Sequence, residues 1–341
     1  MKDLRDRTRE ELAADLISMG ELAYRADQIF AGLFSKGAQS FNELTNLPKS
    51  LREKLAGCFA LRMLEMQRVL RARDRTVKYL FRLHDGLFIE TVLIPAAGRR
   101  TICLSTQVGC KFACVFCASG LRGFKRDLTP SEIVGQVLYL REALEIEPTN
   151  IVFMGMGEPL DNFDAVERSI RILNDPKGFG IAARRLTVST SGIIPGIERF
   201  KALDFQVNLS ISLHAADDAL RSRLMPVGRK YPLADLLEAC EDYLREGGRK
   251  ITLEYVLIEN VNDRPRDADG LTLIARRLRA KVNVIPYSPI EGLVFRTPSE
   301  LRIEAFVRRL EDRGVGVTLR RSKGGDIRAA CGQLVLRNIS L

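Results

Sequence analysis

Hydrophobic positions recur with a helical period in the N-terminal part of the chain. Two successive sets of apolar side chains return every three or four positions: Leu12, Leu16, Met19 and Leu22, then Ala26, Ile29, Phe30 and Leu33. This spacing places each set on one face of an α-helix. Pro48 is a typical start for a further helix over residues 49–55. We therefore expect residues 1–60 to form a small helical accessory domain.

The period changes between residues 66 and 95. Apolar residues first alternate with others and then form a nearly unbroken run: Val69, Val77, Tyr79, Phe81 and residues 87–94. Such patterns are typical of β-strands, and His84-Asp85-Gly86 between them is a hairpin signal. We expect residues 61–100 to form a β-hairpin extension with His84 solvated in its turn. Glu90 lies inside the apolar run, and the pattern leaves open whether it faces solvent or has a function.

Strand-like and helix-like segments alternate from residue 101 onward. The strand-like runs are Thr101–Val108, Asn150–Met154, Arg185–Thr190, Gln206–Leu213, Ile251–Ile258 and Lys281–Tyr287. The helical patterns between them cover about 131–145, 162–174, 217–225, 232–246 and 267–279. This series predicts an α/β fold, an incomplete (β/α)6 barrel over residues 101–295 with its helices outside. Working residues of such barrels lie at the carboxyl ends of the strands.

Composition narrows the class of protein. A hydrophobic content of 46% supports a sizeable core, and no apolar run reaches the roughly 18 residues of a membrane span. The N-terminus, Met1–Asp6, carries charges of both signs and lacks the apolar core of a secretory signal. Seven cysteines, an odd number, argue against a disulfide scaffold. We expect a cytoplasmic protein without a membrane partner, in which clustered cysteines indicate metal binding or catalysis.

The net charge of +10 is concentrated in two segments. Residues 61–100 carry nine basic and four acidic groups, and residues 296–341 carry ten basic and five acidic groups. The helical region 1–60 and the barrel region 101–295 are each neutral. This distribution indicates either a polyanion that touches the two basic segments or simply a solvated basic surface.

Three of the seven cysteines lie within eight residues, at Cys110, Cys114 and Cys117. Their C-x₃-C-x₂-C loop follows the first barrel strand. Thiolates are preferred ligands of iron–sulfur clusters and zinc, and three protein ligands leave one coordination position open for a substrate or cofactor. Two alternatives stay open. The cysteines could form a zinc site that a fourth ligand from elsewhere completes, or they could be three small buried residues in a turn.

Small polar residues and glycines follow the other strands. The segments are residues 154–159 with Gly157 and Glu158, residues 189–196 with Ser189, residues 210–214 with Ser212, Leu213 and His214, and residues 286–289 with Ser288. Each segment alone is a weak signal. On one barrel face beside three cysteines, they predict a site for a small polar molecule. We favour a cofactor contact for His214 over a structural role or metal ligation.

The remaining cysteines differ in their surroundings. Cys331 lies beside Gly332 in a polar, basic, loop-like stretch, which favours a reachable thiol. Cys103 is on the first barrel strand. Cys58 and Cys240 lie in helical, apolar settings, and we expect both to be in the core.

As a set, these motifs resemble radical S-adenosylmethionine (SAM) enzymes, and more closely the adenine-C2 RNA methyltransferases that modify large-subunit rRNA and tRNA. The resemblance covers nearly the whole chain. It rests on Tyr24–Phe30, Ile89–Val92, Ser105–Cys110, Gly155–Leu160, Ser189–Gly192, Ser212–Ala215 and Ala330–Leu334.

The resemblance implies two cofactors and the residues that hold them. Cys110, Cys114 and Cys117 would bind a [4Fe–4S] cluster whose open iron position takes the amino and carboxylate groups of SAM. The SAM contacts would be Gly157, Glu158, Ser189, Ser212, Leu213 and His214. The family usually has an asparagine at the position of Ser288, so that contact would be lost or use water here.

It also implies the reaction and its partners. Cys331 would take a methyl group from one SAM, and a 5′-deoxyadenosyl radical from a second would activate it for addition to adenine C2. Glu90 would be the general base, and Cys103 would release the product through a transient disulfide with Cys331. The substrates would be an adenosine in the peptidyl transferase centre of 23S rRNA, before ribosome assembly is complete, and the adenosine 3′ of the anticodon in tRNAs. An electron donor such as flavodoxin would be needed, and no DNA partner is expected.

Two other functions compete with C2 methylation. Related enzymes methylate C8 of the same adenine and confer antibiotic resistance, but Pro159 and Ser191 are more similar to the C2 group. A non-catalytic RNA-binding protein with a structural cluster or zinc is the second alternative, and it gives Cys331 no purpose.

Overall fold

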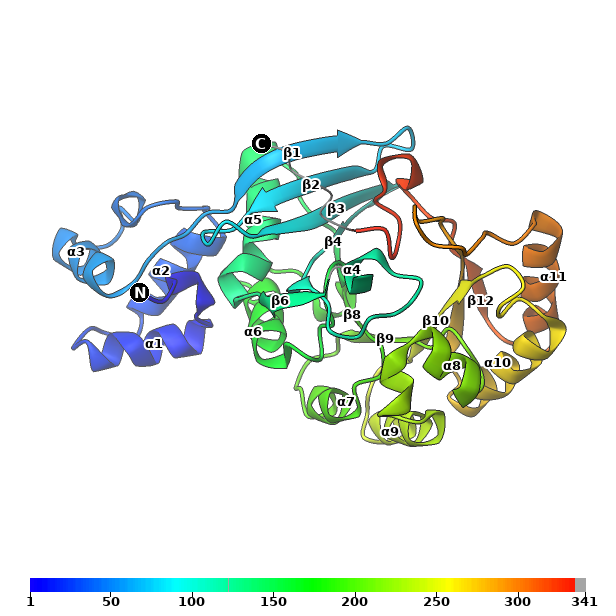
Figure 1. The fold of residues 1–341 in the computed structure, drawn as a ribbon. Helices are drawn as coiled ribbons and strands as arrows, with labels where there is room; N and C mark the ends of the chain where they lie inside the picture. The colour runs from blue at the N-terminus through cyan, green and yellow to red at the C-terminus, as the bar shows by residue number, and fades with distance from the viewer. Residues whose placement is uncertain (122, 335–341) are drawn as a thin grey trace.

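The computed structural model describes residues 1–121 and 123–334. Its N-terminal region is helical, with two 3₁₀ turns beside three α-helices: η1 (Leu4–Asp6), α1 (Arg9–Ser18), α2 (Arg25–Phe34), η2 (Phe41–Glu43) and α3 (Lys49–Cys58). Thr8 caps α1 in a reciprocal pair with Glu11. The helices lie at one end of the molecule, coloured blue in Figure 1. The helical accessory region predicted from the sequence is therefore present.

A ten-stranded sheet forms the centre of the molecule (Figure 1). In spatial order its strands are β1 (Glu65–Arg71), β2 (Val77–Arg82), β3 (Phe88–Ala96), β4 (Arg99–Cys103), β7 (Asn150–Phe153), β8 (Leu186–Thr190), β9 (Asn208–Ser212), β10 (Thr252–Leu257), β11 (Lys281–Pro286) and β12 (Val317–Leu319). Strands β1 to β4 pair in antiparallel fashion, and β4 to β12 pair in parallel. Because β1 and β12 stay unpaired with each other, the barrel is open, as expected.

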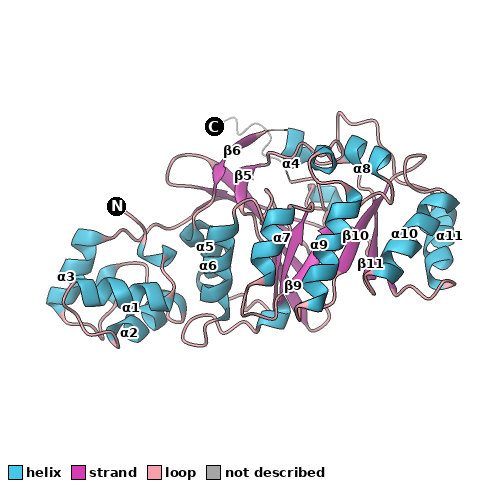
Figure 2. Cartoon of the chain, turned by 90° about the horizontal axis from the view of Figure 1, so that it is seen from below, coloured by secondary structure: helices cyan, strands magenta, loops and turns pink. Residues whose placement is uncertain are grey.

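Helices cover the outer face of the parallel strands (Figure 2). They are α5 (Pro130–Leu144), α6 (Phe163–Asn174), α7 (Ile194–Lys201), α8 (Asp218–Leu224), α9 (Leu233–Arg245), α10 (Pro265–Arg277) and α11 (Glu300–Glu311), with 3₁₀ turns η3 (Ala183–Arg185), η4 (Pro226–Arg229) and η5 (Gly325–Ile327). The apolar core lies between the helices and the sheet. In the part of the chain described, we find no helix with both the length and the apolar character to cross a membrane.

The structure corrects four details of the prediction. The first barrel strand ends at Cys103. Beyond it, the Ser105 hydroxyl donates to the Glu90 carbonyl, and the Ser105 backbone N–H donates to the Gln136 side chain. Beyond it a separate two-stranded sheet forms from β5 (Gln107–Gly109) and β6 (Phe124–Asp127). Helix α7 was not predicted, since its first turn was interpreted as loop. The extension also has three antiparallel strands before the barrel rather than a single hairpin.

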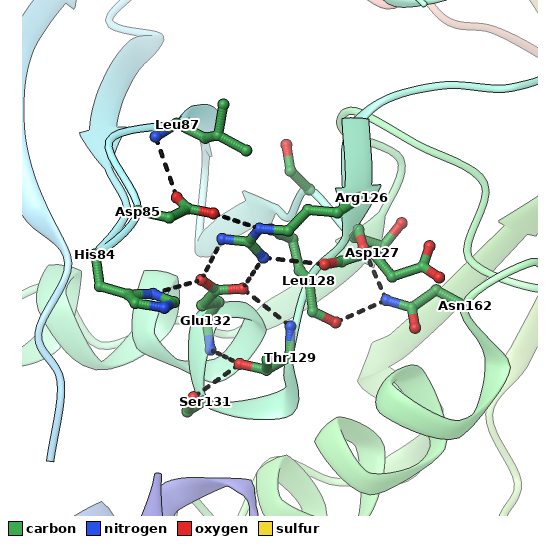
Figure 3. Close-up of polar contacts among 12 residues, drawn as sticks. His84, Asp85, Leu87, Arg126, Asp127, Leu128, Thr129, Ser131, Glu132 and Asn162 are labelled. Carbon is green, nitrogen blue, oxygen red and sulfur yellow. Dashed lines mark hydrogen bonds and ion pairs between the residues drawn. The ribbon is translucent and has the colours of Figure 1, made fainter. Parts of the chain in front are cut away.

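Polar contacts fix the accessory helices and the extension to the barrel. Asp6 accepts a hydrogen bond from the backbone of Ser131 at 2.9 Å, at the start of α5. Figure 3 shows the adjoining network, in which Arg126 on β6 bonds Glu132 on α5 through two nitrogens and Asp85 in the β2–β3 turn. His84 is exposed as expected, but its Nδ1 lies 3.4 Å from Glu132. The network joins the β2–β3 turn to β6 and α5, which follow each other closely in the sequence and lie far from that turn.

Candidate functional site

A pocket opens at the carboxyl ends of the barrel strands. Its lining includes Cys110, Cys114, Cys117, Gly157, Glu158, Ser189, Ser212, His214, Glu254, Arg320 and Cys331. Most of these positions come from the strand ends that the sequence singled out. The tertiary structure therefore brings the cysteine loop, the polar strand ends and Cys331 to one cavity.

Side-chain hydrogen bonds join the two ends of the loop that carries the three cysteines. Asn162 lies just before α6, and its side-chain amide donates to the backbone carbonyls of Thr106 and Leu128, at 2.8 Å each. Gln107 donates to Asp127 and Asp161, at 2.7 and 2.8 Å. These bonds hold the two ends of the loop together. Within the loop, Ala113 has a φ of 47°, a left-handed conformation that side chains rarely adopt.

The three thiols are chemically suited to a soft metal group. Burial is the largest influence on each: it raises the pKa of Cys110 to about 12 and raises the pKa values of Cys114 and Cys117. Among residues 1–121 and 123–334, no group of three or more His, Cys, Asp or Glu side chains lies close enough together to hold a metal ion. Cluster binding would have to displace the protons and draw the thiols together.

Glu158 anchors the turn after β7. Its carboxylate accepts hydrogen bonds from the backbone of Ser191 at 2.7 Å and of Leu160 at 3.1 Å, so it joins the ends of β7 and β8. Burial raises the pKa of this carboxyl, while these bonds oppose the increase. Gly157 has a φ of 98°, and a Cβ there would lie 2.5 Å from the Cβ of Gln107. Only glycine fits at this close approach of two loops.

His214 is a buried, neutral residue at the end of β9. Its φ of 58° is unusual for a residue other than glycine. Its Nδ1 accepts a hydrogen bond from the Val256 backbone at 3.0 Å, and its ring lies edge-on to Phe116 in the cysteine loop. Burial, with a smaller contribution from Arg221, lowers the pKa of His214 to about 3. Because Nδ1 is an acceptor, the ring proton is on Nε2.

Strand register places Glu90 and Cys103 on the same sheet face. Val92 on β3 pairs with Cys103 on β4 and with Lys78 on β2. Side chains alternate along a strand, so Glu90, two positions before Val92, shares this face. Both Glu90 and Cys103 are buried. The possibility that Glu90 faces solvent is therefore wrong.

The C-terminal segment covers this face. Ala329 and Leu334, on either side of Cys331, pack against Val92 and Cys103. The Ser119 hydroxyl donates to the Leu334 carbonyl at 2.7 Å, and the Ala118 backbone donates to the Gly332 carbonyl at 2.7 Å. These bonds fasten the segment to the end of the cysteine loop. Cys331 itself is exposed, as expected for a reachable thiol.

Cys103 is the buried member of the pair. Burial raises the pKa of its thiol to about 12, the charge of a Cys331 thiolate would raise it further, and Arg320 opposes the increase. All seven cysteines are free thiols in this structure. The transient disulfide between Cys103 and Cys331 stays a prediction.

Other predicted positions lie elsewhere. Leu213 is fully buried in the core, and neither it nor Ser288 lines the pocket. Cys240 is in the core as expected. The prediction for Cys58 was wrong: it ends α3 and is exposed, because that helix buries Leu51 and Leu55 instead.

The sequence analysis missed two charged residues in the pocket. Glu254 is buried on β10, accepts a hydrogen bond from Asn283 at 3.0 Å and lies 3.9 Å from Arg320. Arg320 follows β12 and lies 3.7 Å from the sulfur of Met154. A carboxylate inside an apolar strand, the same signal that drew attention to Glu90, also marks Glu254. No local pattern indicates a role for Arg320, because β12, the strand that precedes it, was not among the predicted strands.

Comparisons with known proteins agree with this geometry. Residues 104–270 match the model of the radical SAM superfamily, and residues 2–61 match the ribosomal RNA large subunit methyltransferase N-terminal domain. A probable dual-specificity RNA methyltransferase RlmN from Gemmatimonas aurantiaca is 50% identical, over 94% of this chain and 88% of that protein. The dual-specificity RNA methyltransferase RlmN from Geobacter sulfurreducens is 46% identical, over 98% and 92%.

A solved structure extends the similarity to the whole fold. The crystal structure of a radical SAM methyltransferase from Sphaerobacter thermophilus matches with a TM-score of 0.92 and 46% identity, over 98% of this chain and 99% of that one. Identity at this level over nearly the full length includes the accessory helices, the barrel and the described part of the C-terminal segment. The chain therefore belongs to the RlmN family of radical SAM methyltransferases.

Proposed function

We propose that this enzyme methylates C2 of an adenosine in the peptidyl transferase centre of 23S rRNA and of the adenosine 3′ of the anticodon in tRNAs. Its membership of the RlmN family supports RNA methylation. The observation that carries the site assignment is the meeting of Glu90, Cys103 and the Cys331 segment on one sheet face, beside the pocket lined by the three clustered cysteines.

The pocket residues fit the two cofactors of this family. Cys110, Cys114 and Cys117 supply three soft ligands from one loop, which suits a [4Fe–4S] cluster with an open iron position. Gly157, Glu158, Ser189, Ser212 and His214 would hold SAM, whereas the predicted contacts Leu213 and Ser288 do not line the pocket. When bound, the cluster and SAM would supply the radical chemistry that a non-nucleophilic carbon such as adenine C2 requires.

The chain's own residues would carry the methyl group and the proton. Cys331, exposed beside the pocket, would accept a methyl group and lose its thiol proton to solvent. Glu90, buried on the neighbouring sheet face, would take the proton from C2. Cys103 on the same face would attack the Cys331 sulfur to release the product. Its raised pKa means that it must lose a proton before it can act.

We propose that the domains divide the work of binding RNA. The accessory helices of residues 1–60 and the basic extension of residues 61–100 would hold the RNA, while the barrel of residues 101–295 carries the chemistry. Residues 296–341 would bring the methyl carrier to it. The target base must be unstacked to enter the pocket, which favours rRNA before ribosome assembly is complete. A reduced donor such as flavodoxin would supply electrons.

The proposal is tested by incubating anaerobically reconstituted enzyme with SAM, a reductant and either a 23S rRNA fragment or tRNA. Mass spectrometry of the nucleosides should find 2-methyladenosine. Finding 8-methyladenosine would show that the related C8 reaction is the right one. The absence of 5′-deoxyadenosine would favour a non-catalytic RNA-binding protein.

Two cysteine variants separate the proposed roles. Cys331→Ala should keep its iron but lose RNA methylation, because no methyl carrier remains. Cys103→Ala should accumulate a covalent protein–RNA adduct on denaturing gels, because the release step is blocked. Normal turnover by either variant would refute the role assigned to that thiol. Cys58→Ala is the matched control, since this exposed thiol lies on α3 in the accessory helices.

A further inference from the structure

Lys78 on β2 makes two buried contacts that no part of the proposed mechanism uses. Its Nζ lies 2.9 Å from Oε1 of Glu90, and the two side chains are 7% and 6% exposed. The same Nζ donates a hydrogen bond to the backbone carbonyl of Arg328 at 2.9 Å. Arg328 is three residues before Cys331. One ammonium group thus contacts both Glu90 and the segment that bears the methyl-carrying thiol.

Strand register explains the first contact. Lys78 pairs with Val92 and Leu80 pairs with Glu90 across β2 and β3. Lys78 and Glu90 are therefore diagonal neighbours on one face of an antiparallel pair, within reach of each other's long side chains. Because each of these strands is paired on both sides, the contact is fixed by the backbone and does not depend on a loop.

Charge gives the contact a chemical consequence. A buried ammonium group strongly favours an ionised carboxylate at 2.9 Å, and a buried ion pair loses much when one partner is removed. Glu90 is thereby held in the form that accepts a proton. The guanidinium of Arg328 turns away to Glu291 at 2.8 Å, so that residue approaches Lys78 with its carbonyl.

The second contact ties the base to the methyl carrier. The segment before Cys331 is also held at Asp326, which accepts from the Arg73 backbone, and at Gly324, which donates to Asp74. Of these three contacts with the segment, the one made by Lys78 also involves Glu90. A shift of the segment would therefore act on the ion pair, and a change in the ion pair would act on the segment.

We propose that Lys78 is a positioning residue that keeps Glu90 ionised and sets its place relative to the Cys331 segment. The inference rests on the proposed function, in which Glu90 is the base. During the reaction a proton leaving C2 goes to the Glu90 carboxylate, and Lys78 takes no part in the proton transfer. Lys78 touches no substrate atom and acts through Glu90 and the Arg328 carbonyl.

The test compares Lys78→Met and Lys78→Arg with Lys201→Met, which removes a lysine at the end of α7 that pairs with Glu198 and Glu246. In single-turnover reactions, Lys78→Met should load Cys331 with methyl to within about twofold of the normal extent. It should slow product release by at least about tenfold, as expected for impaired general-base catalysis, and accumulate the protein–RNA adduct. Lys78→Arg should restore most of the rate, and Lys201→Met should be normal.

A measurement without cofactors checks the link to the segment. In the cluster-free protein, amide hydrogen exchange over residues 324–331 should rise in Lys78→Met and stay near normal in Lys78→Arg and Lys201→Met. Unchanged exchange in Lys78→Met would overturn the proposed tie to the Cys331 segment.

A double-mutant cycle separates this inference from the proposed function. Lys78→Met should slow release no further in a Glu90→Gln background, because the carboxylate that it positions is gone. Additive effects would overturn the inference. Glu90→Gln with normal turnover would instead refute the base role itself. If Lys78→Met does not fold, the release rates of Lys78→Arg and of the double variant Lys78→Met with Glu90→Gln are compared instead. Neither of these variants leaves a buried charge unpaired.

Discussion

At the residue scale, the pocket contains a histidine that stays neutral because of where it lies. His214 is 5% exposed, donates nothing through Nδ1 and accepts from the Val256 backbone. Burial, and secondarily Arg221, lowers its pKa to about 3, against an ordinary value of 6.5. The neutral ring can offer its Nε2 proton to a ligand at any pH at which the enzyme works. A charged imidazolium would instead repel the cationic sulfonium of SAM.

This lowered pKa predicts a pH dependence of stability. Between about pH 6.5 and pH 3 the unfolded chain binds a proton at His214 and the folded chain does not. The stability contributed by the neutral ring is therefore complete above pH 6.5 and is lost as the pH falls. The free energy of unfolding of the cluster-free protein should fall about 1.4 kcal/mol per pH unit faster than that of His214→Asn below pH 6. Urea titrations across this range measure the difference.

The other histidine provides the control. His84 is exposed in the β2–β3 turn, so His84→Asn should keep the steep dependence of the unmodified protein. Equal slopes for His214→Asn and the unmodified protein would contradict the assignment of a buried neutral ring.

At the element scale, the cysteine loop is a long excursion between a barrel strand and its helix. It leaves β4, passes through β5, α4 (Ala118–Leu121) and β6, and returns at Thr129, the cap of α5. The Arg126 network in Figure 3 fastens its returning strand, and Asn162 bonds both of its ends. The loop can thus present three thiols to the pocket while its base stays fixed.

Asn162→Ala should loosen this loop. The change leaves the buried Leu128 carbonyl without its side-chain donor, which costs about 1–3 kcal/mol of unfolding free energy. We also expect less iron per chain after anaerobic reconstitution, because the thiols are no longer held to one opening. Iron analysis and denaturant unfolding on the same samples check both expectations.

Asn174→Ala is the matched control for this change. Asn174 ends the same helix and donates to the Ile181 carbonyl at 2.9 Å, away from the cysteine loop. It should lose some stability and keep a full complement of iron. If Asn162→Ala is destabilised but also keeps all its iron, the hydrogen bonds of Asn162 have no part in cluster binding.

At the scale of the whole molecule, positive charge is carried on the sheet extension. Arg68 and Arg71 on β1, with Arg73 and Arg75 in the following turn, are all exposed, and no ion pair found among the described residues involves them. Figure 1 shows this turn next to the red C-terminal segment, to which it is bonded through Asp326 and Asp74. RNA held on the extension would therefore lie beside the methyl carrier.

Arg68→Gln with Arg71→Gln should weaken RNA binding and its salt dependence together. If each arginine neutralises one phosphate of single-stranded RNA, the slope of log K against log salt concentration should become shallower by about 1.4. Fluorescence anisotropy over a salt series measures it. Arg277→Gln removes an arginine that already pairs with Glu241 on the far side of the barrel, and it should leave the slope unchanged. A slope unaltered by the double change would place the RNA elsewhere.

Local patterns were enough to predict much of this protein. Helical and strand periods depend on neighbours within a few residues, so the accessory helices and six barrel strands could be predicted from the sequence. The cysteine loop could be found because its three thiols are close in sequence. Helix α7 was not predicted because Pro195 and Gly196 at its start are typical of loops, although Pro is also favoured in a first helical turn.

By itself, the sequence determined which segments are helices and strands, which residues carry reactive groups and which family the motifs resemble. Only the tertiary structure decided which of those groups meet. Glu90, Cys103 and Lys78 share a face through strand register, and the segment of Cys331 reaches that face from far along the chain. Register and long-range packing depend on pairing between distant residues, and no local period records them.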